Sequence, residues 1–267
     1  MDLRLRGKRA LVTGSSSGIG RAIALGLAAE GVAVVVHGRD AERAGATAEA
    51  ITAAGGQASV VLGDLGDDSA AEQVAADATT AFGGIDILVN NAGSTGNEAG
   101  WNAPAADWLA SYDANVVPAV RLIHALTPAM REANWGRVIQ IGSAAHPFPL
   151  PRQAAYCAAK GALANLTVSL SKELAGTGIT VNTISPGPTK TEGFRQLALT
   201  FAKHHGLGED LDAATDALVN GPLANPSGRL TEPEEIAALL TLVASPLGAS
   251  INGANLRIDG GFTPTVN

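Results

Sequence analysis

The sequence predicts a doubly wound α/β fold, in which a mostly parallel seven-stranded sheet carries helices on both faces. Short runs rich in Val, Ile and Leu alternate with longer, Ala-rich amphipathic stretches along the chain. Continuously apolar runs are typical of strands that are buried on both faces, and such strands occur in parallel sheets. Right-handed crossovers through the intervening helices then place ligands at the carboxyl ends of the strands.

Each element follows from this alternation. The strands are expected at residues 10–12, 32–37, 58–62, 85–89, 138–141, 179–184 and 255–258. Helices are expected at residues 19–30, 41–54, 68–82, 105–134, 156–175 and 232–244, and the fourth could break near Pro118. Residues 190–228 are polar, weakly periodic and interrupted by Gly and Pro. We expect a mobile substrate lid there, within a single domain that spans residues 1–267.

The composition argues against nucleic acids and anionic membranes as partners. The 267 residues carry a formal net charge of -7, and their lysines and arginines do not cluster, whereas phosphate surfaces attract positive charge. The single cysteine, Cys157, excludes an internal disulfide and a cysteine metal cluster. The amino terminus lacks the apolar segment of a signal peptide, and no run approaches about 18 apolar residues. We therefore expect a soluble, cytoplasmic protein with a small-molecule partner.

A glycine-rich turn directly after the first strand indicates a dinucleotide site. Glycines allow the backbone to approach a pyrophosphate, and the amino terminus of the next helix attracts its negative charge. The spacing Gly-x-x-x-Gly-x-Gly is a weak motif alone, but its position between a strand and a helix strengthens it. The cofactor-binding residues expected in this turn are Gly14, Ser15, Ser16, Ser17, Gly18 and Ile19.

The end of the second strand indicates which dinucleotide is preferred. An NAD site favours an acidic residue there, whereas this chain has Gly38 followed by Arg39. Because the planar guanidinium of arginine suits a phosphate, we expect NADP(H) rather than NAD(H); the alternative is that Arg39 is a solvated loop residue. Asp64, just after the third strand, could accept a hydrogen bond from the adenine amino group or cap the following helix.

A tyrosine and a lysine near the middle of the chain indicate acid–base chemistry. Tyr156 and Lys160 are four residues apart in a predicted helix, so they share one face. A nearby ammonium favours the phenolate, which would lower the pKa of Tyr156 from its usual value of about 10 toward neutrality. Ser143 follows the fifth strand shortly upstream. These residues suit a reaction in which an alkoxide needs a hydrogen-bond donor and a proton source.

Taken together, these motifs resemble the short-chain dehydrogenase/reductase family over nearly the whole chain. Each motif is short, but their order and spacing on the matching strands and helices are specific. The resemblance implies a Rossmann fold, a nicotinamide cofactor and, by analogy with many relatives, a homotetramer. The shared residues are Gly14-x-x-x-Gly18-x-Gly20, Asn90-Asn91-Ala92-Gly93, Asn115, Ser143, Tyr156, Lys160 and Pro186-Gly187.

The resemblance implies catalytic roles for four residues. Tyr156 would protonate the carbonyl oxygen, and Lys160 would bind the nicotinamide ribose and lower the pKa of Tyr156. Ser143 would bind and polarise the substrate carbonyl, and Asn115 would hold a water that links Lys160 to solvent. Taken singly, each has an ordinary structural alternative, such as a buried amide for Asn115.

The resemblance also distributes further cofactor contacts along the carboxyl edge of the sheet. These are Asp64 and Leu65 for the adenine, Asn91, Ala92 and Gly93 for the adenosine-side ribose and the central sheet, and Pro186, Gly187 and Thr189 for the nicotinamide.

The substrate pocket is expected beside Ser143. His146 and Phe148 after the fifth strand, with Phe194 of the lid, predict a partly apolar cavity for a ketone or 3-oxoacyl group; Trp101 is expected on another wall. No metal site is expected, since His204 and His205 lie side by side without a carboxylate at ligand spacing.

The leading interpretation is an NADP(H)-dependent carbonyl reductase or alcohol dehydrogenase. The alternatives are a 3-oxoacyl thioester reductase, an NAD-dependent sugar or alcohol dehydrogenase, another reaction on the same scaffold such as enoyl reduction, and a non-enzymatic cofactor sensor. The negative net charge and Thr177, where carrier-protein reductases often have Arg, argue against dedication to an acyl carrier protein. Enoyl reductases tend to space the tyrosine and lysine more widely, and a sensor would typically lack one of them.

Overall fold

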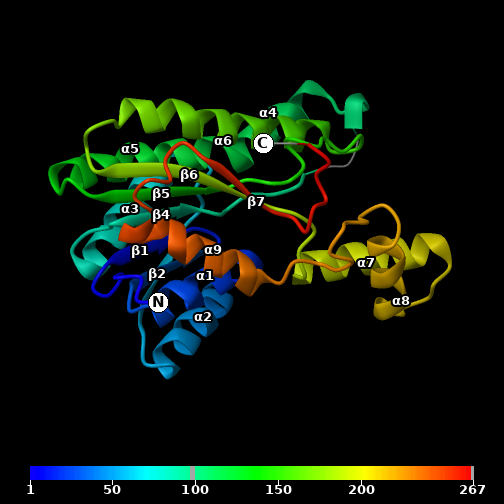
Figure 1. The fold of residues 1–267 in the computed structure, drawn as a ribbon, viewed down its shortest axis with the longest axis horizontal. Helices are drawn as coiled ribbons and strands as arrows, with labels where there is room; N and C mark the ends of the chain where they lie inside the picture. Colours follow the sequence, from blue (N-terminus) through cyan, green and yellow to red (C-terminus); the bar gives the residue numbers. More distant parts are fainter. Residues whose placement is uncertain (97–99, 266–267) are drawn as a thin grey trace.

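The computed structural model describes residues 1–96 and 100–265, and its strands form one seven-stranded sheet (Figure 1). Every neighbouring pair of strands is parallel, and their order is β3-β2-β1-β4-β5-β6-β7. The order reverses between β1 and β4, where sheets of this kind bind ligands. The bounds are β1 (Arg9–Val12), β2 (Ala33–Gly38), β3 (Gln57–Leu62), β4 (Ile87–Asn90), β5 (Gly136–Ile141), β6 (Ile179–Pro186) and β7 (Asn255–Ile258).

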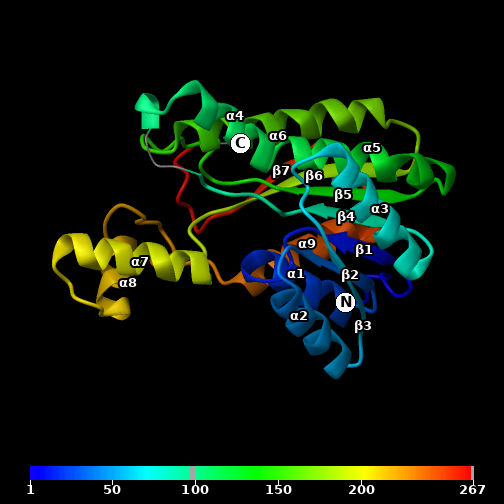
Figure 2. The ribbon, with the colours of Figure 1, turned by 180° about the vertical axis from the view of Figure 1, so that it is seen from behind.

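Helices cover both faces of the sheet, so the predicted doubly wound fold is confirmed (Figures 1 and 2). One face packs against α1 (Gly18–Ala29), α2 (Ala41–Ala53) and α9 (Pro233–Ala244). The other packs against α3 (Asp68–Phe82), α5 (Val117–Glu132) and α6 (Ala154–Glu173), with α4 (Ala105–Asn115) beside α6. Two further helices, α7 (Glu192–His205) and α8 (Leu211–Val219), project from the carboxyl edge. They make up most of the segment that is expected to be a substrate lid, and this segment is called the lid below.

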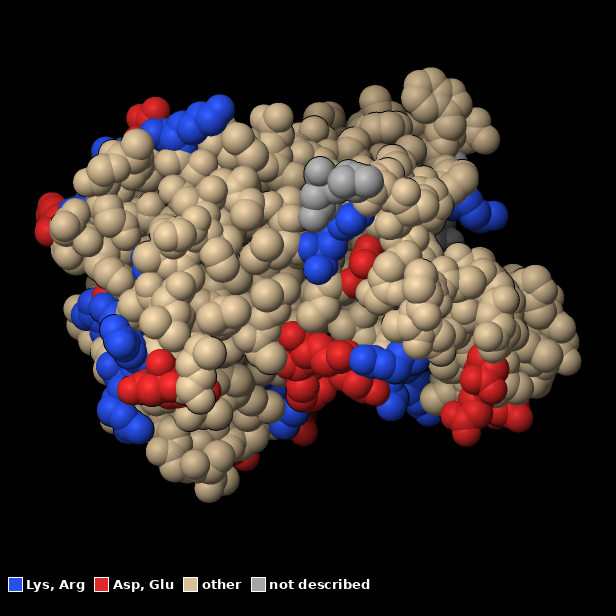
Figure 3. Space-filling view, viewed as in Figure 1, with Lys and Arg blue, Asp and Glu red and all other residues tan. Residues whose placement is uncertain are grey.

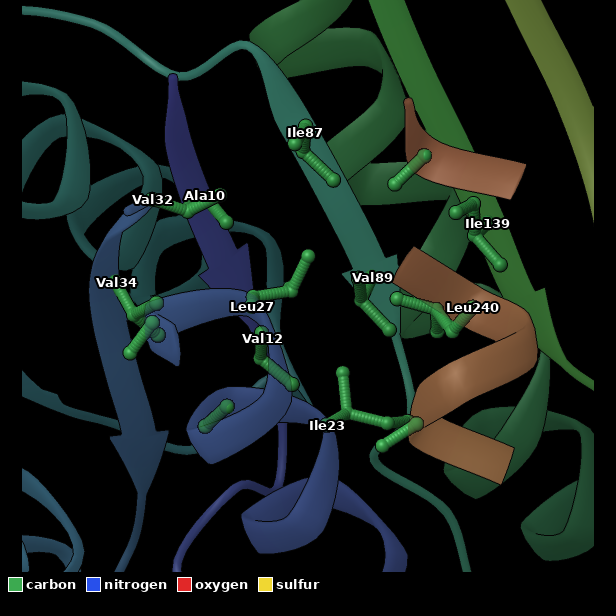
Figure 4. Packing of buried hydrophobic residues seen from close by; sticks show 14 of the residues in the cluster. Ala10, Val12, Ile23, Leu27, Val32, Val34, Ile87, Val89, Ile139 and Leu240 are labelled. Atoms are coloured by element: carbon green, nitrogen blue, oxygen red, sulfur yellow. The ribbon is translucent and has the colours of Figure 1, made fainter. Parts of the chain in front are cut away.

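The sheet separates two apolar cores, because successive side chains of a strand point to opposite faces. Val12 and Val89 lie on the α1 and α9 side, where they pack with Ile23 and Leu240 (Figure 4). Leu11, Leu88 and Val138 lie on the α3 and α5 side. Burial of these branched side chains stabilises the strands, and the candidate site lies at the carboxyl ends of these strands.

The predicted long helix over residues 105–134 is two helices. α4 ends at Asn115. The next residue, Val116, stays in the right-handed region but has a φ of -113° with ψ -55°, far from the usual helical φ of about -63°. α5 begins with Pro118 in its first turn. Proline is tolerated there because it has no amide hydrogen to donate. The break therefore falls two residues before Pro118.

The lid is helical rather than irregular. Thr191 and Asp210 accept hydrogen bonds from the first turns of α7 and α8, and Gly206 ends α7 in the left-handed conformation. His204 and His205, which are not expected to bind a metal, lie in the last turn of α7. The two helices share a small apolar cluster of their own, consisting of Ala198, Ala202, Ala214 and Leu218.

The surface shows no broad basic face in the view of Figure 3. Lys and Arg side chains form small separate groups there, and acidic side chains gather where the main body meets the lid. Among the described residues, none of the helices combines the length and apolarity needed to cross a bilayer.

Candidate active site

The turn between β1 and α1 is shaped to receive an anion. Gly14 and Gly18 have φ values of +62° and +53°, which favour glycine. Among the described residues, no side chain caps the amino terminus of α1, whereas Asp40 and Asp67 cap α2 and α3. The free amide hydrogens of α1 can therefore bind a pyrophosphate. The residues present fit the dinucleotide that the motif predicts.

The turn is tied to the Asn-Asn-Ala-Gly segment after β4. The Asn91 side-chain amide donates to the Thr13 and Gly14 carbonyl oxygens at 2.9 and 3.1 Å. The Thr13 hydroxyl accepts from the backbone amides of Asn91 and Ala92, each at 2.9 Å. Ser15 is fully buried, and its hydroxyl donates to the Val12 carbonyl oxygen at 2.7 Å. The side chains of Asn91 and Ser15 are thus used to hold the turn itself.

The predicted adenine and phosphate residues lie together at the ends of β2 and β3. Arg39 and Asp64 are both exposed, with 3.8 Å between the guanidinium Nη1 and the carboxylate Oδ2. Asp64 accepts from the Gly66 amide at 2.9 Å, whereas Asp67 caps α3, so the capping alternative for Asp64 is wrong. The Leu65 side chain is buried in the core. Only its backbone can face a cofactor.

The catalytic residues carried over from the resemblance converge at the ends of β4 and β5. Lys160 is 5% exposed, and its ammonium donates to the Ile141 carbonyl oxygen at 2.9 Å. The Asn115 side chain exchanges hydrogen bonds with the backbone of Ser94 at 3.2 and 2.8 Å. A Cβ atom on Gly93 would lie 2.6 Å from Asn115 Oδ1 and 3.5 Å from Lys160 Nζ. Asn115 and Lys160 therefore flank Gly93 closely.

Tyr156 and Lys160 lie on one side of α6, as the spacing predicts, with 5.7 Å between Nζ and the centre of the phenol ring. The expected direction of the tyrosine shift is wrong in this structure. Burial raises the pKa of Tyr156, and its side-chain hydrogen bond with Ser143 offsets this only in part. Lys160 is bonded to Ile141 instead, and burial lowers its own pKa to about 8. At neutral pH the phenol therefore holds its proton.

Of the other predicted substrate residues, His146 lies beside Ser143, Phe148 lies in the same loop after β5, and Phe194 belongs to the lid. His146 Nδ1 lies 3.3 Å from the Ser143 carbonyl oxygen, and burial lowers the pKa of the imidazole. Phe148 is 37% exposed and packs edge-on against Phe262 from the carboxyl-terminal segment, with 5.6 Å between ring centres. Phe194 packs against the apolar cluster of the lid.

Trp101 is not placed in the predicted pocket wall. It is 83% exposed and packs edge-on against Trp108. Both line an apolar groove of about 630 Å³ together with Ala103, Ala105, Leu109 and Tyr112, and neither Ser143 nor Tyr156 contributes to it.

The lid begins beside the residues that are expected to bind the nicotinamide. The Thr189 hydroxyl donates to the Gly187 carbonyl oxygen at 2.8 Å, and the Gly187 amide donates to the Ile258 carbonyl oxygen at 3.0 Å. Thr191 then approaches the glycine-rich turn, because its Cγ2 lies 3.5 Å from the place a Cβ on Gly18 would take. Pro186, Gly187 and Thr189 thus join the site to the lid.

Sequence reasoning missed three residues at this site: Thr13, Thr191 and His37. Thr13 and Thr191 bond to neighbouring backbone, and each stands next to a motif that was recognised. His37 is a polar residue in the otherwise apolar strand β2 and is only 3% exposed. A lone polar residue in a buried strand was the available signal.

Comparison with known proteins agrees with this geometry. Residues 8–200 match the family model described as short chain dehydrogenase. The chain is 37% identical to D-threitol dehydrogenase of Mycolicibacterium smegmatis, covering 98% of this chain and 95% of that one. It is 36% identical to the 3-oxoacyl-[acyl-carrier-protein] reductase FabG of Vibrio cholerae, covering 97% and 99%. The solved structure of L-sorbose reductase from Gluconobacter frateurii, complexed with NADPH and L-sorbose, superposes over the full length of both chains with a TM-score of 0.94 and 32% identity.

Proposed function

The chain belongs to the short-chain dehydrogenase/reductase family, and on that basis we propose that it transfers a hydride between NADP(H) and a carbonyl compound or the corresponding secondary alcohol. The convergence of Ser143, Tyr156 and Lys160 beside the uncapped turn of α1 carries this proposal. A proton donor, a hydrogen-bond donor and a dinucleotide cradle then share the carboxyl edge of the sheet.

The side chains supply what a carbonyl reduction needs besides the hydride. Bound nicotinamide provides or accepts the hydride. Tyr156 gives its proton to the substrate oxygen, and the raised pKa of Tyr156 keeps that proton in place at neutral pH. Ser143 donates a hydrogen bond to the same oxygen. Lys160 uses one of its three donors on Ile141, which leaves two for ribose and water. Asn115 completes this set by positioning the segment at Ser94.

Three observations bear on the substrate. The identities to a D-threitol dehydrogenase and to a 3-oxoacyl reductase are 37% and 36%, so sequence similarity does not choose between a polyol and a thioester. The close superposition on L-sorbose reductase favours a sugar or polyol as the second candidate, beside a simple ketone. The net charge of -7 disfavours an acidic carrier protein. We also propose a homotetramer, as the family resemblance implies, and the mass of the particle in solution tests this.

The cofactor preference has its own test. Oxidation of NADPH and NADH is followed with a panel of ketones, ketoses and 3-oxoacyl thioesters. Because Arg39 is exposed and follows the end of β2, its guanidinium can bind a 2′-phosphate. We expect the wild type to favour NADPH, and Arg39→Asp to raise the KM for NADPH about 100-fold while that for NADH changes little.

Arg131→Asp, in the last turn of α5 at the opposite edge of the sheet, makes the same change of charge away from the site. This control should keep the preference of the wild type. Equal use of both cofactors by the wild type, or an Arg39→Asp variant with unaltered selectivity, would show that Arg39 does not read the phosphate.

A further inference from the structure

We infer that His37 is a positioning residue of the dinucleotide site, whose neutral imidazole holds the glycine-rich turn in its binding conformation; this rests on the proposed function. His37 lies in β2, directly before Gly38 and Arg39. Its ring Nδ1 accepts a hydrogen bond from the Gly14 backbone amide at 3.3 Å. Gly14 is the first glycine of the turn and has a positive φ. The imidazole thus fixes the point at which the chain leaves β1.

The backbone of His37 adds two more bonds to the same turn. The Ser15 amide donates to the His37 carbonyl oxygen at 2.9 Å, and the His37 amide donates to the Ser15 hydroxyl at 3.0 Å. The backbone bonds are open to any residue at this position, whereas the bond to Gly14 needs a side-chain acceptor. Among these three bonds, only the one from Gly14 depends on the identity of residue 37.

The hydrogen bonding also defines the protonation state. An imidazole nitrogen that accepts a hydrogen bond carries no proton, so the proton of neutral His37 is on Nε2. Nε2 is buried beside the backbone of Gly63, without a well-formed hydrogen bond. Burial also lowers the pKa of His37 to about 4, which agrees with a neutral ring.

The position of His37 connects three parts of the predicted cofactor site. Its ring meets the pyrophosphate turn at Gly14, the next residues in the chain are Gly38 and Arg39, and its far edge faces Gly63, next to Asp64. A Cβ on Gly38 would lie only 3.1 Å from the Ser16 Oγ atom, so turn and strand end are in direct contact. A displacement of the turn would weaken the binding of both nicotinamide dinucleotides, since both contain the pyrophosphate.

A pair of variants separates the acceptor from the bulk of the ring. His37→Leu keeps a side chain of similar size without an acceptor, whereas His37→Asn places Oδ1 where Nδ1 was. Dissociation constants for NADPH and NADH are measured by titration of cofactor fluorescence, together with kcat, the substrate KM and the thermal midpoint. We expect His37→Leu to weaken both cofactors about tenfold with kcat and substrate KM near wild type, and His37→Asn to recover most of the affinity.

A spectroscopic measurement checks the tautomer independently. In a nitrogen-detected NMR spectrum, the signals absent from His37→Asn belong to His37, and they should show protonated Nε2 and unprotonated Nδ1 at neutral pH. Protonation at Nδ1 would overturn the inference.

The binding titrations distinguish the possible failures. A folded His37→Leu variant with wild-type affinity for both cofactors, or equal losses in the Leu and Asn variants, would overturn the positioning role and leave the proposed function standing. A wild type that binds neither dinucleotide would overturn the proposed function and this inference with it.

Discussion

At the scale of single residues, Lys160 lowers the stability of the fold but is needed for the proposed chemistry. Lys160 is 5% exposed, and among the described residues its ammonium has one hydrogen-bond partner, the Ile141 carbonyl oxygen. A buried charge with so few partners is costly, and its pKa is accordingly lowered to about 8. Lys160 is present despite this cost because the proposed chemistry needs a cation near the cofactor ribose and Tyr156.

Lys160→Met should therefore stabilise the cofactor-free protein while abolishing turnover. Methionine keeps the length of the side chain without the charge, so the free energy of unfolding should rise by about 1–3 kcal/mol. Denaturant unfolding of the wild type and the variant in the same buffer measures this difference. A variant clearly less stable than the wild type would mean that the ammonium is well solvated in the fold.

The difference in stability between the wild type and Lys160→Met should depend on pH. The pKa of Lys160 is about 8 in the folded state and 10.5 as its ordinary value, so between these limits the unfolded chain binds more protons. Below about pH 8, Lys160 is charged in both states and destabilises the folded protein by its full amount. As the pH rises toward 10.5, this destabilisation disappears. The advantage of Lys160→Met should shrink over that window. An advantage that grows there would contradict the lowered pKa.

At the scale of elements, the lid is a hairpin of two helices that is largely independent of the main cores. α7 and α8 pack on each other through Ala198, Ala202, Ala214 and Leu218. A parallel bridge between Thr189 and Thr231 closes the base of the hairpin, and the exposed ion pair of Lys190 with Glu232 adds little stability. Elements with so few buried apolar contacts open more readily than core strands.

Hydrogen exchange tests this account of the lid. Amides of α7 and α8 should exchange faster than those of β4 and β5, which are wholly buried. Because Thr191 lies next to Gly18, NADPH should slow exchange most in the first turn of α7. If NADPH leaves the exchange rates in that turn unchanged, the lid does not contact the cofactor site.

The elements differ in how well the sequence predicts them. Strands β2, β5 and β6 are buried at every residue, and their Val- and Ile-rich stretches were recognised in the sequence although buried polar residues such as His37, Gln140 and Asn182 interrupt them. The lid helices were missed because their apolar face is thin and made largely of alanine, beside Gly206 and Gly208. Helix propensity and capping by Thr191 and Asp210 outweighed the glycines that suggested irregular structure.

At the scale of the whole molecule, the topology brings together motifs that are far apart in the chain. A parallel sheet places the carboxyl ends of β1, β4, β5 and β6 on one edge, so Gly14, Asn91, Ser143 and Gly187 could be assigned to one site from their positions after strands. Two other features could not be predicted from the sequence: the hydrogen bond from Gly14 to His37 and the direction in which the pKa of Tyr156 is shifted. They depend on burial and on which group accepts the hydrogen bond of Lys160.

The proposed role of Tyr156 is to deliver the proton in a reduction that uses NADPH. Its most direct test is rapid-mixing absorbance of the reduced nicotinamide with wild type and Tyr156→Phe, each saturated with NADPH and with a carbonyl substrate that the wild type reduces. The variant loses only the phenolic oxygen, so its dissociation constant for NADPH should stay near wild type while the rate of NADPH oxidation falls at least about 100-fold. Oxidation at the wild-type rate in Tyr156→Phe would contradict this role.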